Sequence, residues 1–288
     1  MREGKPVYST KTKIIRFLIW LFLLLLAFLV VFPVIYIIFG SFKENQELLV
    51  GGVNVLPKVW APENYKQAWD AADFGLYTRN SIILALGVMA VSVLNASMAG
   101  YVFDRSTLKI KEVIYYTIVA FMFISVGSVT LRPLYMLAVK LKMNKSLLSV
   151  ILISAGAGQA TYIFLSRGFV GSIPKELDEA AKIDGCSFFK TYLYVILPLM
   201  KPVIGTVALL SFRHGWNEYL LPLVFTMSNP KLRPLTVGVN MLKAAGDGSA
   251  AWNIMFAGAV IAIVPMVVIY IIFNRYFVSG MTAGAVKG

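Results

Sequence analysis

Four polar residues interrupt one long apolar run, and they are the residues best placed to do chemistry. Arg213, His214, Asn217 and Glu218 lie within residues 194–225. Charged groups are costly in hydrocarbon, so we expect them to be paired or to face protein or water. His214 and Glu218 are four residues apart and share a helical face, whereas Arg213 is less well placed. The cluster either lies near the outer end of a helix, where it reaches water or pairs with a second protein, or forms a polar patch for a hydrophilic solute.

Motifs for covalent catalysis are missing from the sequence. It has no Gly-x-x-x-x-Gly-Lys-Ser/Thr phosphate-binding loop and no His/Glu spacing for a metal, and it contains a single histidine. A P-loop ATPase, a zinc protease or a His-dependent hydrolase is therefore not expected. We predict no catalytic residue, no metal site and no cofactor, so any energy for transport must come from another subunit.

A second polar region, residues 174–202, is a charge-rich island between long apolar runs. Pro174 suits the first turn of a helix, where a missing N–H costs nothing. Glu176, Asp178 and Glu179 follow, at the positive end of the helix dipole. The pattern predicts a short helix that begins at Pro174.

Small and apolar residues follow these acids at helical spacing. Leu177, Ala180 and Ala181 share one face, where the two alanines let another chain come close. Gly185 permits the backbone turn that ends the helix. A second amphipathic segment begins at Phe188. We predict a docking element here; the alternative is an ordinary amphipathic linker.

This stretch resembles the EAA loop of ABC-importer permeases. The positions that match are Glu179, Ala180, Ala181, Gly185, Leu197 and Pro198. Val195 stands where that pattern usually has isoleucine. Further matches are Leu56, Pro57, Trp60, Pro62, Asn64, Tyr65, residues 275–280 and residues 284–288. Together they resemble the carbohydrate-uptake subfamily, and within it the shorter maltose-type permease, over essentially the whole chain.

The resemblance implies a function for this loop. In the family it is the cytoplasmic coupling helix that sits in a cleft of the ATPase subunit, where its glutamate contacts a basic residue. The residues that would carry this coupling are Leu177, Glu179, Ala180, Ala181, Asp184 and Gly185. The chain would then be a transport subunit and not an enzyme, because separate nucleotide-binding subunits hydrolyse ATP.

The resemblance also implies partners and cargo. The expected partners are a second, non-identical permease, two ATP-binding cassette ATPases, an extracytoplasmic solute-binding protein and the lipid bilayer, but no nucleic acid. The expected cargo is a sugar or oligosaccharide, although shorter maltose-type subunits often leave most sugar contacts to the second permease. Aromatic residues in the path could stack on sugar rings or simply anchor the membrane interface. The candidate path residues are Arg213, Trp216, Asn217, Glu218 and Tyr219.

The composition is that of a polytopic membrane protein. Hydrophobic residues make up 58% of the chain and charged residues 14%, against about 25% charged in soluble domains. The net charge of +13 would suggest nucleic acid in a soluble protein, but here the basic residues flank apolar spans. A lone cysteine, Cys186, allows no internal disulfide. We expect a multi-pass protein of a bacterial inner or plasma membrane.

Six apolar runs are long enough to cross a hydrocarbon core of about 30 Å at about 1.5 Å per residue. We predict an all-α integral membrane protein, which by the resemblance has the type I ABC importer permease fold. Ser92, Ala96 and Gly100 form a small-residue stripe that should pack closely on another helix. The predicted spans are residues 14–39, 78–103, 113–131, 146–166, 194–225 and 254–273.

The basic N-terminal cluster and the resemblance place both termini in the cytoplasm. Residues 41–77 and 226–253 should then lie outside and residues 104–112 inside. By the resemblance, residues 226–253 reach toward the binding protein and the tail lies against the ATPases; a plain loop and a frayed tail are the alternatives. The predicted parts are an N-terminal segment 1–13, a permease domain 14–275 containing the EAA coupling loop 168–201, and a tail 276–288.

Other functions stay open. The same EAA loop would serve a permease for a polyamine or another small solute, although the tail and the Trp60 region favour a sugar. An ion-coupled secondary transporter usually shows inverted repeats and intramembrane acids, and this sequence has Glu218 but no repeat. An intramembrane hydrolase would need a nucleophile or metal constellation across the spans, and the sequence shows none.

Overall fold

The structure is a computed structural model that describes residues 10–50, 54–71, 73–124, 127–242 and 251–285. In the last of these ranges, side chains are described up to residue 271. All regular secondary structure in these ranges is helical. The chain forms two compact units, Met1–Trp69 with Leu242–Val260 and Asp70–Met241 with Ile261–Gly288. Every predicted coupling or path residue belongs to the second unit.

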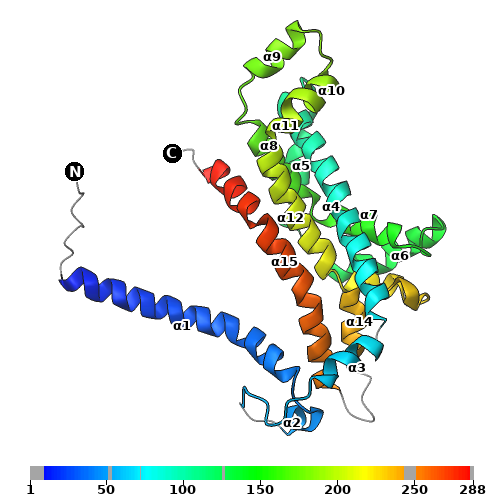
Figure 1. Ribbon diagram of the computed structural model, residues 1–288. Helices are drawn as coiled ribbons and strands as arrows, with labels where there is room; N and C mark the ends of the chain where they lie inside the picture. Colours follow the sequence, from blue (N-terminus) through cyan, green and yellow to red (C-terminus); the bar gives the residue numbers. More distant parts are fainter. Residues whose placement is uncertain (1–9, 51–53, 72, 125–126, 243–250, 286–288) are drawn as a thin grey trace. The chain divides into compact units, whose positions relative to one another are not determined.

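The first unit is built on helix α1 (Thr10–Gly40), followed by α2 (Asn45–Leu49) and most of α3 (Glu63–Ala71) (Figure 1). Side chains of α1 are exposed all round over residues 13–31. A helix that is apolar on every side is stable only where lipid or other membrane helices surround it. The first predicted span is therefore confirmed as a continuous helix.

Asn64 links the parts of the first unit. Its Nδ2 donates to the carbonyls of Ser41 and Lys43 at 2.9 and 2.8 Å, and its Oδ1 accepts from Asn253 Nδ2 at 2.9 Å. Asn64 is 3% exposed, so these bonds satisfy an amide that would otherwise be costly to bury. The residue that contributed to the family resemblance thus has a structural role.

The second unit contains the helices that position the site. They are α4 (Phe74–Arg105), α5 (Lys111–Ala120), η1 (Gly127–Thr130), α6 (Leu131–Lys140), α7 (Leu147–Ala157), α8 (Gln159–Val170), α9 (Glu176–Ile183), α10 (Phe188–Thr191), the π-helical turn η2 (Tyr192–Ile196), α11 (Leu197–Leu199), α12 (Lys201–Asn217), α13 (Leu220–Phe225), η3 (Pro230–Leu232) and α14 (Leu235–Leu242). The last helix, α15 (Trp252–Ala285), begins in the first unit and continues in the second.

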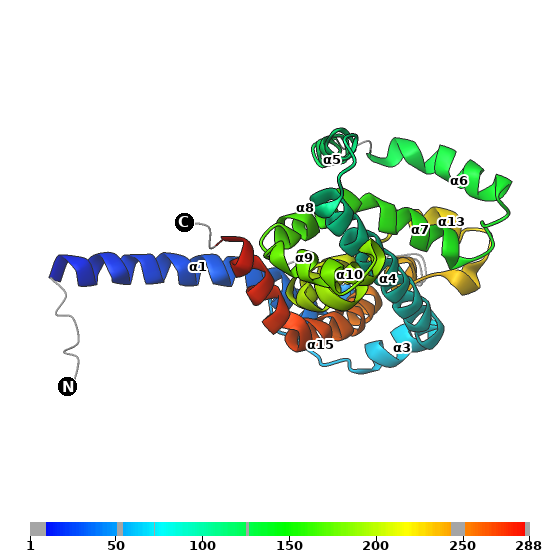
Figure 2. The same cartoon turned by 90° about the horizontal axis from the view of Figure 1, so that it is seen from above.

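Helix α4 is central to the second unit, where it packs along α12, α8 and α7 (Figure 1). The predicted small-residue stripe is confirmed, because Ser92 and Ala96 have no exposed surface. A Cβ on Gly100 would lie 2.6 Å from Ser166 Cβ, so α4 and α8 approach backbone to backbone. Seen from above, α9 and α10 cover one end of these helices (Figure 2).

Among the described residues, α1, α4 and α15 up to Ile271 are long and apolar enough to span a membrane. Two bent pairs raise the number of candidate spans to as many as five. The bend between α7 and α8 is 54°, and that between Phe188–Leu199 and α12 is 80°. Pro198 and Pro202 flank the second bend, and each lacks the amide hydrogen that a continuous helix needs. Helix α15 also runs on into the predicted tail.

The third, fourth and fifth predicted spans are not continuous helices, and the fourth is divided at Gly158 between α7 and α8. Within residues 113–131, α5 ends at Ala120, and Gly127, at the start of η1, has a φ of +57°, which a continuous right-handed α-helix cannot include. The fifth span ends at Asn217, because Glu218 leaves the helical conformation with a ψ of 127°. Hydropathy measures the length of an apolar run but not the continuity of its backbone. The predicted spans therefore differ from the helices that the structure shows.

Candidate functional site

Helix α9 carries most of the predicted coupling residues and lies at one end of the second unit (Figure 1). It begins later than predicted, since Pro174 lies outside it. The carbonyl of Lys175 accepts from the amides of Asp178 and Glu179 at 3.0 and 3.1 Å and so closes the first turn. The predicted acidic residues do occupy that turn, where the helix dipole stabilises them.

One face of α9 is open. Leu177 is 39% and Ile183 is 87% exposed. Glu179, Ala180 and Lys182 are exposed as well. The EAA-type pattern does not single out Ile183, but a large apolar side chain between the charged residues Lys182 and Asp184 is the signal that could have found it. Apolar and charged groups side by side at an exposed helix are typical of a protein contact surface.

Asp178 and Ala181 form the opposite face, where they are 8% and 5% exposed. The single docking face predicted for Leu177, Ala180 and Ala181 is therefore divided, because Ala181 packs inward where α9 contacts α10 and η2. The cause is an ion pair of 3.0 Å between Arg105 Nε and Asp178 Oδ2. Since Asp178 and Ala181 are three residues apart, the contact that turns one inward also turns the other.

Gly185 ends α9 as predicted, with a φ of +80°. Its amide donates to the carbonyl of Lys182 at 3.0 Å, and the amide of Cys186 donates to that of Ala181 at 2.9 Å. These two bonds satisfy the last carbonyls of the helix in the Schellman arrangement. The preceding residue, Asp184, is exposed at the helix end. The backbone conformation at this position therefore favours glycine.

A polar cavity of about 140 Å³ lies between α9 and the end of α4. Glu179 lines this cavity and is also exposed, so its carboxylate is within reach of a basic group on another protein. The charged residues around the cavity carry both signs: Asp104, Arg105, Lys175, Asp178, Glu179 and Lys182. Sequence reasoning missed Arg105 and interpreted Asp178 only as a helix-start acid.

The candidate path residues lie where α12 ends and α13 begins. Trp216 is 3% exposed, and its ring stacks on Phe212 with the centroids 6.0 Å apart. Tyr219 is 36% exposed, and Arg213 and Asn217 are exposed. Of the two aromatic candidates, Tyr219 therefore has the accessible ring, whereas Trp216 packs within this chain.

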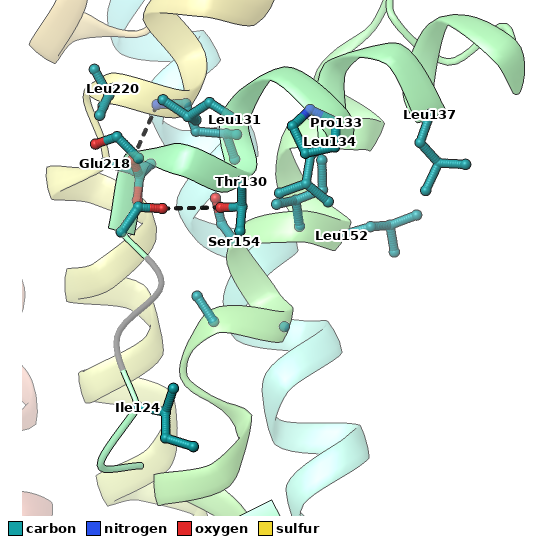
Figure 3. A pocket seen from close by; sticks show the side chains of 16 residues that line it. Ile124, Thr130, Leu131, Pro133, Leu134, Leu137, Leu152, Ser154, Glu218 and Leu220 are labelled. Carbon is teal, nitrogen blue, oxygen red and sulfur yellow. Dashed lines mark hydrogen bonds between the residues drawn. The ribbon is translucent and has the colours of Figure 1, made fainter. Parts of the chain in front are cut away.

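Glu218 connects α12 to α13. Its Oε1 accepts from the amide of Leu221 at 3.3 Å, in the first turn of α13. Its Oε2 lies 3.9 Å from His214 Nε2, which confirms that these two residues share a face. Glu218 also lines a cavity of about 800 Å³ (Figure 3).

The walls of this larger cavity are mostly apolar and come from η1, α6, α7 and the start of α13 (Figure 3). Thr130, Ser154 and Glu218 supply polar groups at one side. Within the described parts of the chain, Ser154 Oγ is buried without a hydrogen-bond partner. A polar solute would find its partners at this side, and lipid or another helix suits the rest of the wall.

Comparisons with known proteins identify the family. Residues 8–283 match the family described as the binding-protein-dependent transport system inner membrane component. The chain is 32% identical to the arabinooligosaccharides transport system permease protein AraQ of Halalkalibacterium halodurans, over 91% of this chain and 93% of the relative. It is 34% identical to the sulfoquinovosyl glycerol transport system permease protein SmoH of Agrobacterium fabrum, over 89% of each.

A solved structure has the same fold. A chain from a bacterial ABC transporter involved in the import of the acidic polysaccharide alginate superposes with a TM-score of 0.80, over 95% of this chain and 100% of that chain. At 21% identity the likeness shows the fold alone, which is the type I ABC importer permease fold. Because the family match runs through the helices of both units and the EAA-type loop, the chain belongs to the inner-membrane components of binding-protein-dependent transport systems.

Proposed function

We propose that this chain is the transmembrane permease subunit of an ABC importer for a sugar or oligosaccharide. The observation that carries the proposal is α9, a helix that exposes Glu179 and Ile183 on one face while its other face is ion-paired to α4. The names of the two relatives describe transport of arabinooligosaccharides and of sulfoquinovosyl glycerol, which supports a carbohydrate cargo.

In this proposal α9 docks in a cleft of a cytoplasmic ATPase. Glu179 pairs with a basic group there, and Leu177, Ala180 and Ile183 fill the apolar part of the contact. Closure of the ATPases on ATP then moves α9, rocks this subunit against a second, non-identical permease, and opens a cavity outward to receive sugar from the binding protein. Gly185 and Asp184 set where the docking helix ends.

The proposed topology has six spans with both termini in the cytoplasm. Each bent pair counts as one span, and α5 with the turns that follow it serves as the third. Arg213, Asn217, Glu218 and Tyr219 are proposed to line the path, and Trp216 supports them from the packed side of α12. In such an arrangement the larger cavity beside Glu218 faces the second permease.

Purification of the assembled transporter from its native host tests this function. The second permease, the ATPases and the binding protein should copurify, and a ligand screen on the binding protein should return a carbohydrate. In a Cys186→Ser background, a membrane-impermeant maleimide added to intact cells should label a cysteine placed at Lys58 but not one placed at Lys182. Labelling at Lys182 would contradict docking of α9 on a cytoplasmic ATPase.

Glu218→Gln is expected to lower sugar uptake about fivefold. This is the change that corresponds to losing a charged interaction worth about 1 kcal/mol. Glutamine keeps an oxygen that can accept from Leu221 but removes the charge beside His214. The yield of assembled complex should therefore stay normal, whereas Glu218→Ala should lower it. Uptake into vesicles per assembled complex is the measurement. Normal uptake for Glu218→Gln would show that the residue only caps α13.

The alternatives predict other outcomes. A permease for a polyamine would copurify with the same partners, but its binding protein would select a cationic ligand and not a carbohydrate. A secondary transporter would transport without an ATPase and would stop when the ion gradient is dissipated. The exposed coupling helix and the family match favour the ATP-driven importer over the second of these.

A further inference from the structure

We propose that Arg105 is a positioning residue that fastens α9 to α4, so that movement of α9 becomes movement of the whole of α4. This inference rests on the proposed function, in which an ATPase moves α9. Arg105 lies outside the EAA-type loop, and the spacing of the loop residues does not point to it. The evidence is the set of contacts that its guanidinium makes.

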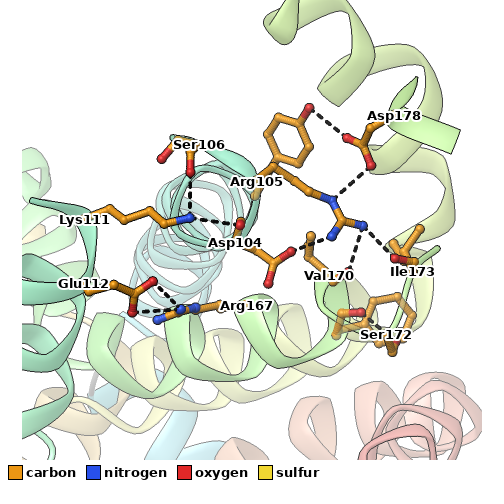
Figure 4. Close-up of polar contacts among 12 residues, drawn as sticks. Asp104, Arg105, Ser106, Lys111, Glu112, Arg167, Val170, Ser172, Ile173 and Asp178 are labelled. Carbon is orange, nitrogen blue, oxygen red and sulfur yellow. Dashed lines mark hydrogen bonds and ion pairs between the residues drawn. The ribbon is translucent and has the colours of Figure 1, made fainter. Parts of the chain in front are cut away.

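All three nitrogens of the Arg105 guanidinium donate hydrogen bonds (Figure 4). Nε donates to Asp178 Oδ2 at 3.0 Å, and Nη1 donates to Asp104 Oδ2 at 2.6 Å. Nη2 donates to the carbonyl of Ile173 at 2.6 Å and to that of Val170 at 3.3 Å. One side chain thus joins the end of α4, the end of α8, the connection to α9 and α9 itself.

The ion pair is buried, since 5% of the Arg105 side chain and 11% of the Asp178 side chain are exposed. Taking two charges out of water is unfavourable unless the geometry is good and further hydrogen bonds are made. Tyr101 supplies one of these, because its hydroxyl donates to Asp178 Oδ1 at 3.2 Å. A planar guanidinium holds its partners in one orientation, which a lysine ammonium cannot do.

Helix α4 continues the connection to the opposite end of the second unit. There Asn80 Nδ2 donates to the carbonyls of Lys231 and Arg233 at 2.8 and 3.0 Å. Ser81 Oγ accepts from the amide of Leu235 at 2.8 Å. These bonds hold the segment before α14 on α4. A displacement of α9 that carries α4 with it therefore reaches this segment through one rigid helix.

A second ion pair at the same end of the unit provides a matched control. Arg167 Nη2 donates to Glu112 Oε1 at 2.8 Å, and the guanidinium of Arg167 lies 3.9 Å from the centroid of the Tyr115 ring. This pair joins α8 to α5 and, like the pair at Asp178, unites an arginine with a carboxylate, although its side chains are more exposed, at 19% and 41% (Figure 4). If movement passes from α9 to α4 through the contact at Arg105, removing the charge of Glu112 should leave that movement unchanged.

The test uses the assembled transporter in vesicles, with a bimane fluorophore on a cysteine placed at Lys231 in a Cys186→Ser background. The probe is MgATP with vanadate, which holds the ATPase subunits closed. With Arg105 present, we expect the bimane emission to change. Arg105→Lys and Asp178→Asn should reduce that change about fivefold or more, the ordinary scale of coupling between sites, while the ATPases still copurify. Tyr101→Phe should reduce it less, because the ion pair remains.

A double variant and a control variant test whether the effect arises from the single contact between Arg105 and Asp178. Arg105→Lys combined with Asp178→Asn should lose no more than the worse single variant, since both act through one contact. Glu112→Gln should respond like the parent protein. A full emission change in Arg105→Lys and Asp178→Asn overturns the inference, and so does an equal loss in Glu112→Gln. Lower yield with a full response in the complex that remains also overturns it, because Arg105 would then be structural only.

Failure of the proposed function has a different signature. If the parent protein shows no response to MgATP with vanadate and no ATPase copurifies, the proposed function fails and this inference fails with it. If the parent protein responds and Glu179→Ala weakens the response, but Arg105→Lys does not, only the role of Arg105 is wrong.

Discussion

Replacing Gly185 with valine is expected to uncouple sugar uptake from ATP hydrolysis almost completely. The φ of +80° at this position lies in a region that β-branched residues avoid, at a cost of about 1–3 kcal/mol. A backbone that relaxes from it loses the bonds to the carbonyls of Lys182 and Ala181 and tilts the exposed face of α9. Membrane insertion depends on the apolar helices, so this chain should still pair with the proposed second permease while binding of the proposed ATPase partner weakens.

Further substitutions at Gly185 separate backbone conformation from side-chain size. Apart from Gly185 and its two chain neighbours, no atom of the described residues lies within 4 Å of a Cβ built at this position, so added bulk meets no obstacle from the rest of the fold. Asparagine visits the left-handed region more readily than alanine or valine. Uptake should therefore fall in the order Gly, Asn, Ala, Val. Binding-protein-stimulated ATP hydrolysis and uptake, each per assembled complex, are the measurements. Normal stimulation in Gly185→Val would mean that α9 is only a linker.

Gly100→Ala is expected to have the largest effect on assembly. A Cβ there would lie 2.6 Å from Ser166 Cβ, 2.8 Å from the carbonyl carbon of Ser166 and 2.9 Å from the amide nitrogen of Arg167. Two of these atoms are backbone atoms of α8, which cannot rotate away as a side chain can. The two helices must separate, and overpacking of this kind costs about 1–3 kcal/mol. We expect less assembled protein and a lower midpoint of thermal unfolding in detergent.

Gly168→Ala is the matched control for this substitution. Gly168 is an exposed residue of α8, and within the described residues a Cβ there would have no neighbour within 4 Å other than the adjacent residues and the backbone of α8 itself. Alanine favours a helix over glycine by about 1 kcal/mol, so the unfolding midpoint of Gly168→Ala should equal or exceed that of the parent protein. If Gly100→Ala behaves in the same way, α4 and α8 do not approach as closely as the structure shows.

Much of the fold could be predicted because it depends on local properties of the chain. The apolar lengths of α1 and α4 predicted both helices, and the small-residue stripe predicted the close contact at Gly100. Continuity of the backbone could not be predicted in the same way. The bend before α12 and the end of α12 at Asn217 depend on prolines and on a carboxylate that caps the next helix. Hydropathy does not report either of these.

The same distinction between local properties and tertiary contacts applies to the candidate site. By itself the sequence determined the position of α9, apart from its first residues, and that Gly185 ends it, because the helix dipole and the sign of φ are local. Only the tertiary structure decided which face of α9 is open. Arg105 is 73 residues from Asp178, and no local pattern states which of three neighbouring acids an arginine so distant in the chain will pair with. That one contact turns Ala181 inward and leaves Glu179 outward, because residues on a helix must rotate together.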